Sequence, residues 1–171
     1  MKNNILKNQV SVICGDSGKG KSILMGALLG TKKYKKGEVR INDKIVIPSL
    51  IMCKEKVSYI SQNAMIFDRS IIENIAYPKT ALNDRMKYYI NKLNLQHLIK
   101  RDTEDIDVRK SISGGEQKRI SIARGISKEA KVYIFDEPTN DLDNENVEAI
   151  IQEIIKLKEN AIVIVVSHDK R

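Results

Sequence analysis

Residues 15–22 read GDSGKGKS, a pattern of residue types that can bind a polyphosphate. Glycines let a loop close around an anion with its backbone N–H groups pointing inward. A helix that begins at the end of such a loop adds the positive end of its dipole. An accidental glycine loop is the alternative. The apolar run before the loop and the helical pattern after it favour a nucleotide site.

The spacing G-x-x-x-x-G-K-S assigns individual tasks within this loop. We expect Lys21 to reach the β- and γ-phosphates of a nucleotide and the Ser22 hydroxyl to bind Mg²⁺. Phosphate binding is thereby predicted for Gly15, Asp16, Ser17, Gly18, Lys19, Gly20, Lys21, Ser22 and Ile23.

Two adjacent acids, Asp136 and Glu137, follow the apolar run VYIF. In open α/β sheets, ligands bind at the carboxyl ends of the strands, where these acids would lie. Beside a phosphate-binding loop, Asp136 is expected to hold Mg²⁺ and Glu137 to polarise an attacking water. Without that loop, two solvated acids at a strand end would be the default. Glu137 therefore predicts hydrolysis in addition to binding.

The stretch SISGGEQKRI places two glycines where a helix should begin. Ser113 and Glu116 satisfy the capping-box pattern S-x-x-E, which explains the serine and the glutamate. A cap does not require Gly114 and Gly115, and glycines weaken the first turn of a helix. Bare backbone N–H groups at a helix N-terminus can approach an anion closely. We therefore predict a ligand-binding role for these four residues.

The composition is that of a globular chain of 171 residues, with 42% apolar residues and a formal charge of +8. The lysines are scattered, and their densest cluster, residues 31–38, is expected to be a solvated loop, not a nucleic-acid surface. Cys14 and Cys53 lack metal-binding spacing and are expected to be reduced, mostly buried thiols. No apolar run is long enough to span a bilayer, and no secretory leader is visible, which predicts a cytoplasmic location.

The elements that must position these residues follow an α/β pattern. Buried strands are expected at 10–14, 57–61, 132–136 and 161–166, a hairpin at 38–46, and helices at 22–29, 116–128 and 146–158. The 22–29 helix is apolar nearly all round and is expected to be buried. Ser70 and Glu73 predict a capped helix, and an amphipathic pattern covers 83–101. Such strands between helices imply a parallel sheet covered on both faces.

The order of these motifs resembles the ATP-binding cassette (ABC) ATPase family over nearly the whole chain. Gln62 in YISQN resembles that family's Q-loop, and residues 113–116 resemble its signature. Residues 140–143 match the D-loop, and His168 matches the switch histidine, which contacts the γ-phosphate in the family. The resemblance implies a P-loop NTPase (RecA-like) α/β core with a mainly parallel sheet, a small antiparallel hairpin and an inserted α-helical lobe.

The resemblance also implies an organisation and a chemistry. The chain would form one nucleotide-binding domain over 1–171, with a catalytic core of about 1–63 and 113–171 and a helical lobe of about 64–112. ATP and Mg²⁺ would be the cofactors. The expected catalytic residues are Glu137, His168, Lys21 and Gln62, and the expected metal site consists of Ser22, Gln62 and Asp136.

The expected partners are a second nucleotide-binding domain, identical or related, and a transmembrane permease domain; nucleic acid is not expected. The signature of one domain would face the phosphate loop of the other, head to tail, on the cytoplasmic face of a membrane. Residues 64–77 resemble the exporter segment that takes a transmembrane coupling helix. A soluble ABC ATPase acting on ribosomes is the alternative.

Three features depart from the family pattern. No aromatic residue precedes Gly15, although the family stacks adenine on one, and the chain ends soon after His168. Either the aromatic stack is missing or the chain is a piece of a longer polypeptide, and the two features together favour the longer polypeptide. The signature has Ile112 and Glu116 where leucine and glutamine are usual. His97 lies in a leucine-rich helical pattern and is expected to be structural.

Overall fold

The computed structural model describes residues 5–16, 18–33, 36–41, 43–49, 56–101 and 112–168. Ser17, Cys53 and the polar segment 102–110 lie outside these residues. The expectation that the cysteines are mostly buried is wrong for Cys14, which is exposed at the end of the first strand.

A parallel sheet of four strands, in the order β1-β6-β5-β4, forms the centre of the fold. The strands are β1 (Val10–Cys14), β4 (Val57–Ile60), β5 (Val132–Asp136) and β6 (Ile162–Ser167), and each neighbouring pair is parallel. A separate antiparallel pair joins β2 (Val39–Ile41) to β3 (Lys44–Val46). The predicted mixed α/β fold, with a parallel sheet and a small hairpin, is confirmed.

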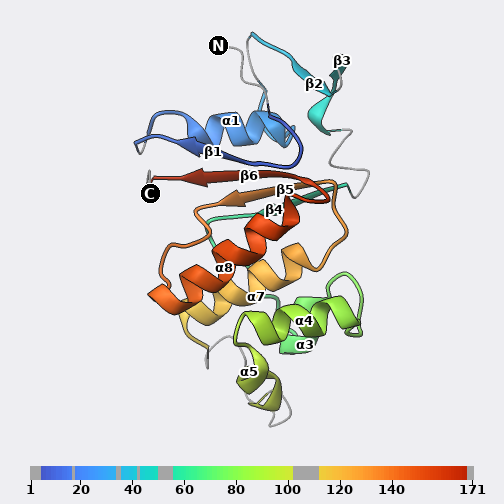
Figure 1. Cartoon of the computed structure of the whole chain (residues 1–171), viewed down its shortest axis with the longest axis vertical. Coiled ribbons are helices and arrows are strands. Elements are labelled where there is room, and N and C mark those ends of the chain that lie inside the picture. The colour runs from blue at the N-terminus through green and yellow to red at the C-terminus, as the bar shows by residue number, and fades with distance from the viewer. Residues whose placement is uncertain are drawn as a thin grey trace.

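Helices cover both faces of this sheet (Figure 1). Helix α1 (Lys21–Leu28) lies on one face, and α7 (Gly114–Ile126) and α8 (Asn144–Leu157) lie on the other. Met25 and Leu29 pack with Ile134 and other residues of β5 and β6. The prediction that α1 is buried all round was wrong, because Ile23 on its outer face is 59% exposed.

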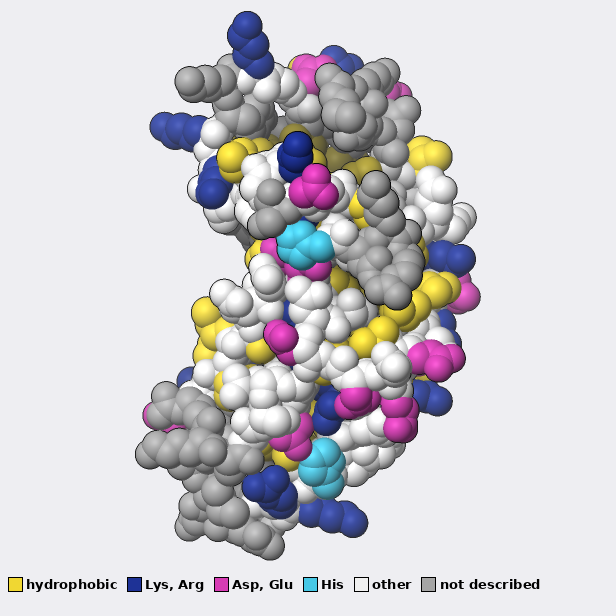
Figure 2. All heavy atoms as spheres, turned by 90° about the vertical axis from the view of Figure 1, so that its left-hand side faces the viewer, with side chains coloured by type: hydrophobic (Ala, Val, Ile, Leu, Met, Phe, Trp, Pro, Cys, Tyr) yellow, Lys and Arg dark blue, Asp and Glu magenta, His cyan; other side chains and the backbone are white. Residues whose placement is uncertain are grey.

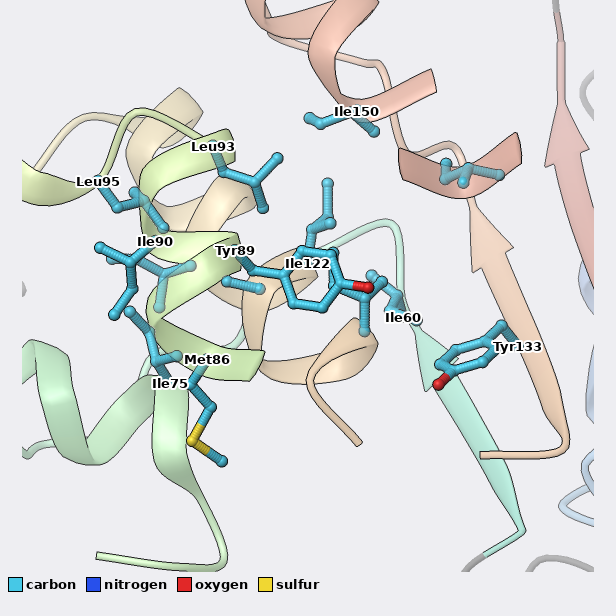
Figure 3. Close-up of a cluster of buried hydrophobic side chains, with 14 of the residues drawn as sticks. Ile60, Ile75, Met86, Tyr89, Ile90, Leu93, Leu95, Ile122, Tyr133 and Ile150 are labelled. Carbon is cyan, nitrogen blue, oxygen red and sulfur yellow. The ribbon is translucent and has the colours of Figure 1, made fainter. Parts of the chain in front are cut away.

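Three short helices pack on the side of α7 that faces away from the sheet: α3 (Ile71–Ala76), α4 (Asp84–Lys92) and α5 (Gln96–Arg101). Figure 3 shows one apolar cluster running from Ile60 of β4 past Ile122 of α7 to Ile75 and Ile90. The capping box that starts α3 at Ser70 is present as predicted. No helix in the described part of the chain is long and apolar enough to cross a membrane.

The amphipathic stretch 83–101 forms two helices, not one. Asn94 adopts a left-handed conformation with φ of 53°, which ends α4 before α5 begins. Leu93 and Leu95 on either side of it are completely buried. The apolar pattern therefore continues through a break in the helix, because asparagine tolerates this conformation better than most residues.

Helix α7 lies close against β4 at Gly125. A Cβ atom there would lie 2.4 Å from Ile60 Cγ1, and the Ser58 hydroxyl donates a hydrogen bond to the Gly125 carbonyl at 2.8 Å. The next residue toward the N-terminus, Arg124, donates to the backbone carbonyls of Asn74 and Met65, each at 2.7 Å. One end of α7 is thus held against the sheet, against α3 and against the segment before α3.

Candidate nucleotide-binding site

The carboxyl ends of the four parallel strands meet at one edge of the sheet. Strand β1 leads into the glycine-rich loop, β5 ends at Asp136, and His168 follows β6 directly. Figure 2 shows this edge, with histidine and acidic side chains next to each other near its middle. Parallel pairing therefore gathers residues from distant parts of the sequence at one place.

The glycine-rich loop has the backbone conformation that an anion site requires. Gly18 and Gly20 have φ of 79° and 89°, in the left-handed region that side chains rarely adopt. A Cβ atom at either position would meet no other atom within 4 Å, so the loop borders open space. Gly20 is the N-cap of α1, and the first N–H groups of a helix lack intrahelical partners. This open loop of N–H donors fits a phosphate group.

Lys21 closes the loop and reaches across to β6. Its ammonium group donates to the backbone carbonyls of Gly15 and of Asp16, the latter at 3.2 Å, and lies 2.9 Å from His168 Nδ1. Because an ammonium group can only donate, Nδ1 is the acceptor, and a neutral imidazole then carries its proton on Nε2. That nitrogen lies 3.0 Å from Glu137 Oε1. The structure thus brings Lys21, His168 and Glu137 into one chain of contacts.

Glu137 is held in an unusual conformation. Its φ is 49°, in the left-handed region, and its side chain is almost completely buried. Its backbone N–H donates to the Val166 carbonyl at 2.9 Å, and its Oε2 accepts from the His168 N–H at 3.3 Å. A non-glycine residue in this region is uncommon, and such residues concentrate at functional sites. These contacts with β6 fix the carboxylate beside the imidazole.

The neighbouring acid, Asp136, accepts a hydrogen bond from the Tyr59 hydroxyl on β4, with an oxygen–oxygen distance of 2.9 Å. Partial burial, the bond itself and the charge of Asp136 together raise the pKa of Tyr59 to about 12. The hydroxyl therefore stays a donor at neutral pH. Tyr59 is not among the residues predicted from the sequence. Its place on the strand next to the acid, three residues before Gln62, is the signal that could have identified it.

Gln62 and Ser22 are both exposed at this edge, and their metal-binding roles stay predictions. The backbone of Gln62 is anchored by a residue that the sequence analysis did not select. Lys118 of α7 is buried, and its ammonium group donates to the Gln62 carbonyl at 2.7 Å and to the Ser61 carbonyl at 3.4 Å. Burial lowers the pKa of Lys118, while the nearby charge of Asp136 acts in the opposite direction.

Residues 113–116 form a second group, at the N-terminus of α7. Ser113 is the N-cap, and the predicted capping box is present, with Glu116 accepting from the Ser113 N–H at 2.7 Å and from its hydroxyl at 2.8 Å. His97 of α5 lies 2.8 Å from the other Glu116 oxygen. Partial burial raises the pKa of Glu116, but the hydrogen bonds from His97 and Ser113 outweigh it and lower that pKa to about 2.

The two glycines of this group have different surroundings. A Cβ atom on Gly114 would meet nothing within 4 Å, so this residue borders open space. A Cβ atom on Gly115 would lie 3.4 Å from the Asp141 carbonyl and from Leu142 Cδ2. The turn at 140–143 of the same chain therefore packs beside Gly115 and leaves Gly114 accessible.

Known proteins with similar sequences are ATP-binding proteins, in agreement with the geometry of the site. A family model described as "ABC transporter" matches residues 1–140. An uncharacterized ABC transporter ATP-binding protein of Haemophilus influenzae is 33% identical over 96% of this chain and 30% of its own length. The molybdate/tungstate import ATP-binding protein WtpC of Methanocaldococcus jannaschii is 33% identical over 96% of this chain and 55% of its own. The chain therefore spans about a third to a half of these curated relatives.

Solved structures agree in fold. A bacterial Atm1-family ABC exporter with ATP bound superposes with a TM-score of 0.81 at 22% identity, over 96% of this chain and 30% of the exporter chain. An ATP-binding subunit of an ABC transporter gives a TM-score of 0.78 at 18% identity, over 96% of this chain and 70% of that chain. The chain belongs to the ABC transporter family and has the fold of its ATP-binding domain.

Proposed function

We propose that this domain binds ATP with Mg²⁺, hydrolyses it, and couples hydrolysis to membrane transport through the head-to-tail pairing of two nucleotide-binding domains. The observation that carries the proposal is the chain of contacts from Lys21 through His168 to Glu137, next to an open glycine-rich loop.

The residues around the loop suit the phosphates and their metal ion. Backbone N–H groups of residues 15–23 bind phosphate oxygens, and Lys21 exchanges its bonds to loop carbonyls for bonds to the β- and γ-phosphates. Ser22, Gln62 and Asp136 supply oxygen ligands, directly or through water, of the kind that Mg²⁺ prefers. When bound, the metal ion neutralises charge on the phosphates.

Glu137 is the base in this proposal. Its buried carboxylate orients a water molecule toward the γ-phosphate and accepts a proton from it. His168 holds this carboxylate through a hydrogen bond from its backbone N–H, its Nε2 lies 3.0 Å from Oε1, and its Nδ1 faces the Lys21 ammonium group. Charge that develops on the phosphate is stabilised by Lys21 and His168 together.

The second domain supplies residues 113–116. The open space at Gly114 lets the N-terminus of α7 approach the γ-phosphate bound to the partner, where its N–H groups and the Ser113 hydroxyl can donate. Loss of the γ-phosphate removes these contacts and opens the pair. A permease domain would receive this motion at the cytoplasmic face of a membrane. The relatives named for import and export support this role, and none of those named above supports the ribosome-acting alternative.

A Glu137→Gln substitution tests the proposal. We expect turnover to fall about 100-fold or more, as for loss of a general base, while ATP binding is retained. Glu148→Gln on the exposed face of α8 is the matched control and should behave as the parent protein.

Phosphate release measures turnover, and light scattering with Mg²⁺ and ATP measures association. The Glu137→Gln protein should form dimers with ATP and remain monomeric without it. Hydrolysis at the parent rate would refute the role of Glu137. ATP-bound Glu137→Gln protein that stays monomeric would refute the head-to-tail pairing of the isolated domain.

A further inference from the structure

We propose that Tyr59 is a positioning residue for Asp136, so that its hydroxyl sets the direction in which this carboxylate meets the metal ion. The inference rests on the proposed function, in which Asp136 takes part in the Mg²⁺ site. It adds Tyr59, the first residue of the stretch YISQN, to which no motif assigned a role.

The sheet register explains why these two side chains meet. Tyr59 is paired with Ile134 across the parallel strands β4 and β5, and Asp136 lies two residues beyond Ile134. Because alternate side chains of a strand point to the same face, Tyr59 and Asp136 share the face that α1 covers. The offset of two residues is about 6.6 Å along the strand, which a phenol ring can span.

The hydrogen bond from Tyr59 restricts the rotation of the Asp136 carboxylate and leaves most of its acceptor positions available to a metal ion. A carboxylate group has about four acceptor positions, and one hydroxyl donor to Oδ2 fills one of them. The terminal torsion of aspartate has a broad energy minimum, so an unbonded carboxylate would rotate freely over a wide range. The Tyr59 donor removes much of this freedom in advance. Metal binding then loses less entropy, as expected for a ligand held by a supporting hydrogen bond.

The chemistry of Tyr59 and Asp136 favours a strong hydrogen bond between them. Tyr59 is 37% exposed, and its hydroxyl reaches Asp136 at the ligand edge. A hydroxyl that donates to a charged acceptor forms a stronger bond than one between neutral groups. The contact joins β4, which leads to Gln62, to β5, which ends at Asp136. Tyr59 therefore links two of the residues assigned to the metal site.

A Tyr59→Phe substitution removes only the hydroxyl and leaves the ring in place. The matched control is Tyr88→Phe on α4, because Tyr88 donates to the Glu153 carboxylate at 3.2 Å and is 41% exposed. Both substitutions remove a tyrosine donor from a carboxylate at a similar exposure, and Tyr88→Phe also removes an acceptor for Lys156. Tyr88 lies on α4, packed outside the parallel sheet, and has no part in the proposed site.

Both variants are made in the Glu137→Gln background, and ATP affinity is measured by calorimetry over a range of Mg²⁺ concentrations and in EDTA. For Tyr59→Phe, we expect the Mg²⁺ concentration for half-maximal binding to rise about 3- to 10-fold, the equivalent of one hydrogen bond. Affinity in EDTA should not change, because the phosphate loop is untouched. Tyr88→Phe should match the background protein in both conditions.

An unchanged Mg²⁺ requirement in Tyr59→Phe would overturn the inference. A lower requirement would also overturn it, because the hydroxyl would then compete with the metal ion for the carboxylate. If the Glu137→Gln background shows no Mg²⁺-dependent ATP binding, the proposed function itself fails and the inference fails with it. Melting of the nucleotide-free variants at the parent temperature, within about 2 °C, shows that the fold is intact.

Discussion

The close approach of α7 to β4 predicts that replacing Gly125 by alanine destabilises the domain, whereas the same replacement in an ordinary helix stabilises it. In the interior of a helix, replacing glycine by alanine stabilises by about 1 kcal/mol. At Gly125, however, the new Cβ would lie 2.4 Å from Ile60 Cγ1 and 2.8 Å from Cδ1. Carbon atoms prefer separations of about 3.5–4.0 Å, so one element must move by about 1 Å.

The side chain of Ile60 cannot easily move away from the added Cβ atom. Ile60 is buried, and the atom in contact is part of its branched stem, not the end of a flexible chain. Overpacking a core costs about 1–3 kcal/mol, and this contact belongs at the upper end. After the gain in helix propensity of about 1 kcal/mol is subtracted, Gly125→Ala should destabilise the domain by about 2 kcal/mol. For a chain of this size, the melting temperature should fall by about 4–8 °C.

Gly114→Ala is the control on the same helix, because a Cβ atom there meets nothing within 4 Å. It should leave the stability of the isolated domain unchanged or slightly raised. Urea denaturation and calorimetry measure both variants. Shortening the neighbour should relieve the clash, so the cost of Gly125→Ala should be smaller in an Ile60→Ala background than in the parent. Equal costs in the two backgrounds, or a stabilising Gly125→Ala, would refute the packing argument.

Two further substitutions test contacts of α7. His97→Ala should raise the pKa of Glu116 from about 2, because it removes a donor to the carboxylate. Because the pKa of Glu116 is lower in the folded parent than the ordinary value of 4.5, the ionised carboxylate stabilises the fold at pH values above 4.5. This stabilisation is lost as the pH falls from 4.5 toward 2. Carbon-detected NMR titration follows the carboxylate, and an unchanged pKa would exclude His97 as its partner. Lys118→Met should preserve the fold but speed amide exchange after β4, because the Gln62 carbonyl loses its donor. The control Lys128→Met, at an exposed position, should leave amide exchange after β4 unchanged. Equal exchange rates in the two variants would contradict the anchoring role of Lys118.

The order of the motifs was sufficient to predict the sheet edge and the proximity of Lys21, Glu137 and His168 at that edge. Glycine spacing, the apolar run before Asp136 and the capping box at Ser113 are local features, and local features can be recognised without tertiary contacts. The parallel sheet then brings Lys21, Glu137 and His168 together, because strand ends must meet at one edge. The meeting of these three residues could be predicted from the order of the strands along the chain alone.

The missed residues depend on register and packing. Tyr59 meets Asp136 only because β4 and β5 pair with a particular offset, and His97 meets Glu116 only because α5 packs near the start of α7. The break at Asn94 was also missed, since the apolar period continued through it. Each of these contacts joins segments whose relative placement no local pattern specifies.

Because α7 packs tightly at Gly125 and is open at Gly114, its two ends should respond unequally to any tilt. Its 13 residues span about 20 Å, so a rotation of 10° about the tightly packed end would carry the other end through about 3.5 Å. A displacement of that size is comparable to the length of a hydrogen bond. A rearrangement near Asn74 that tilted α7 by this angle would therefore move Gly114, at its exposed end, far enough to make or break a hydrogen bond there.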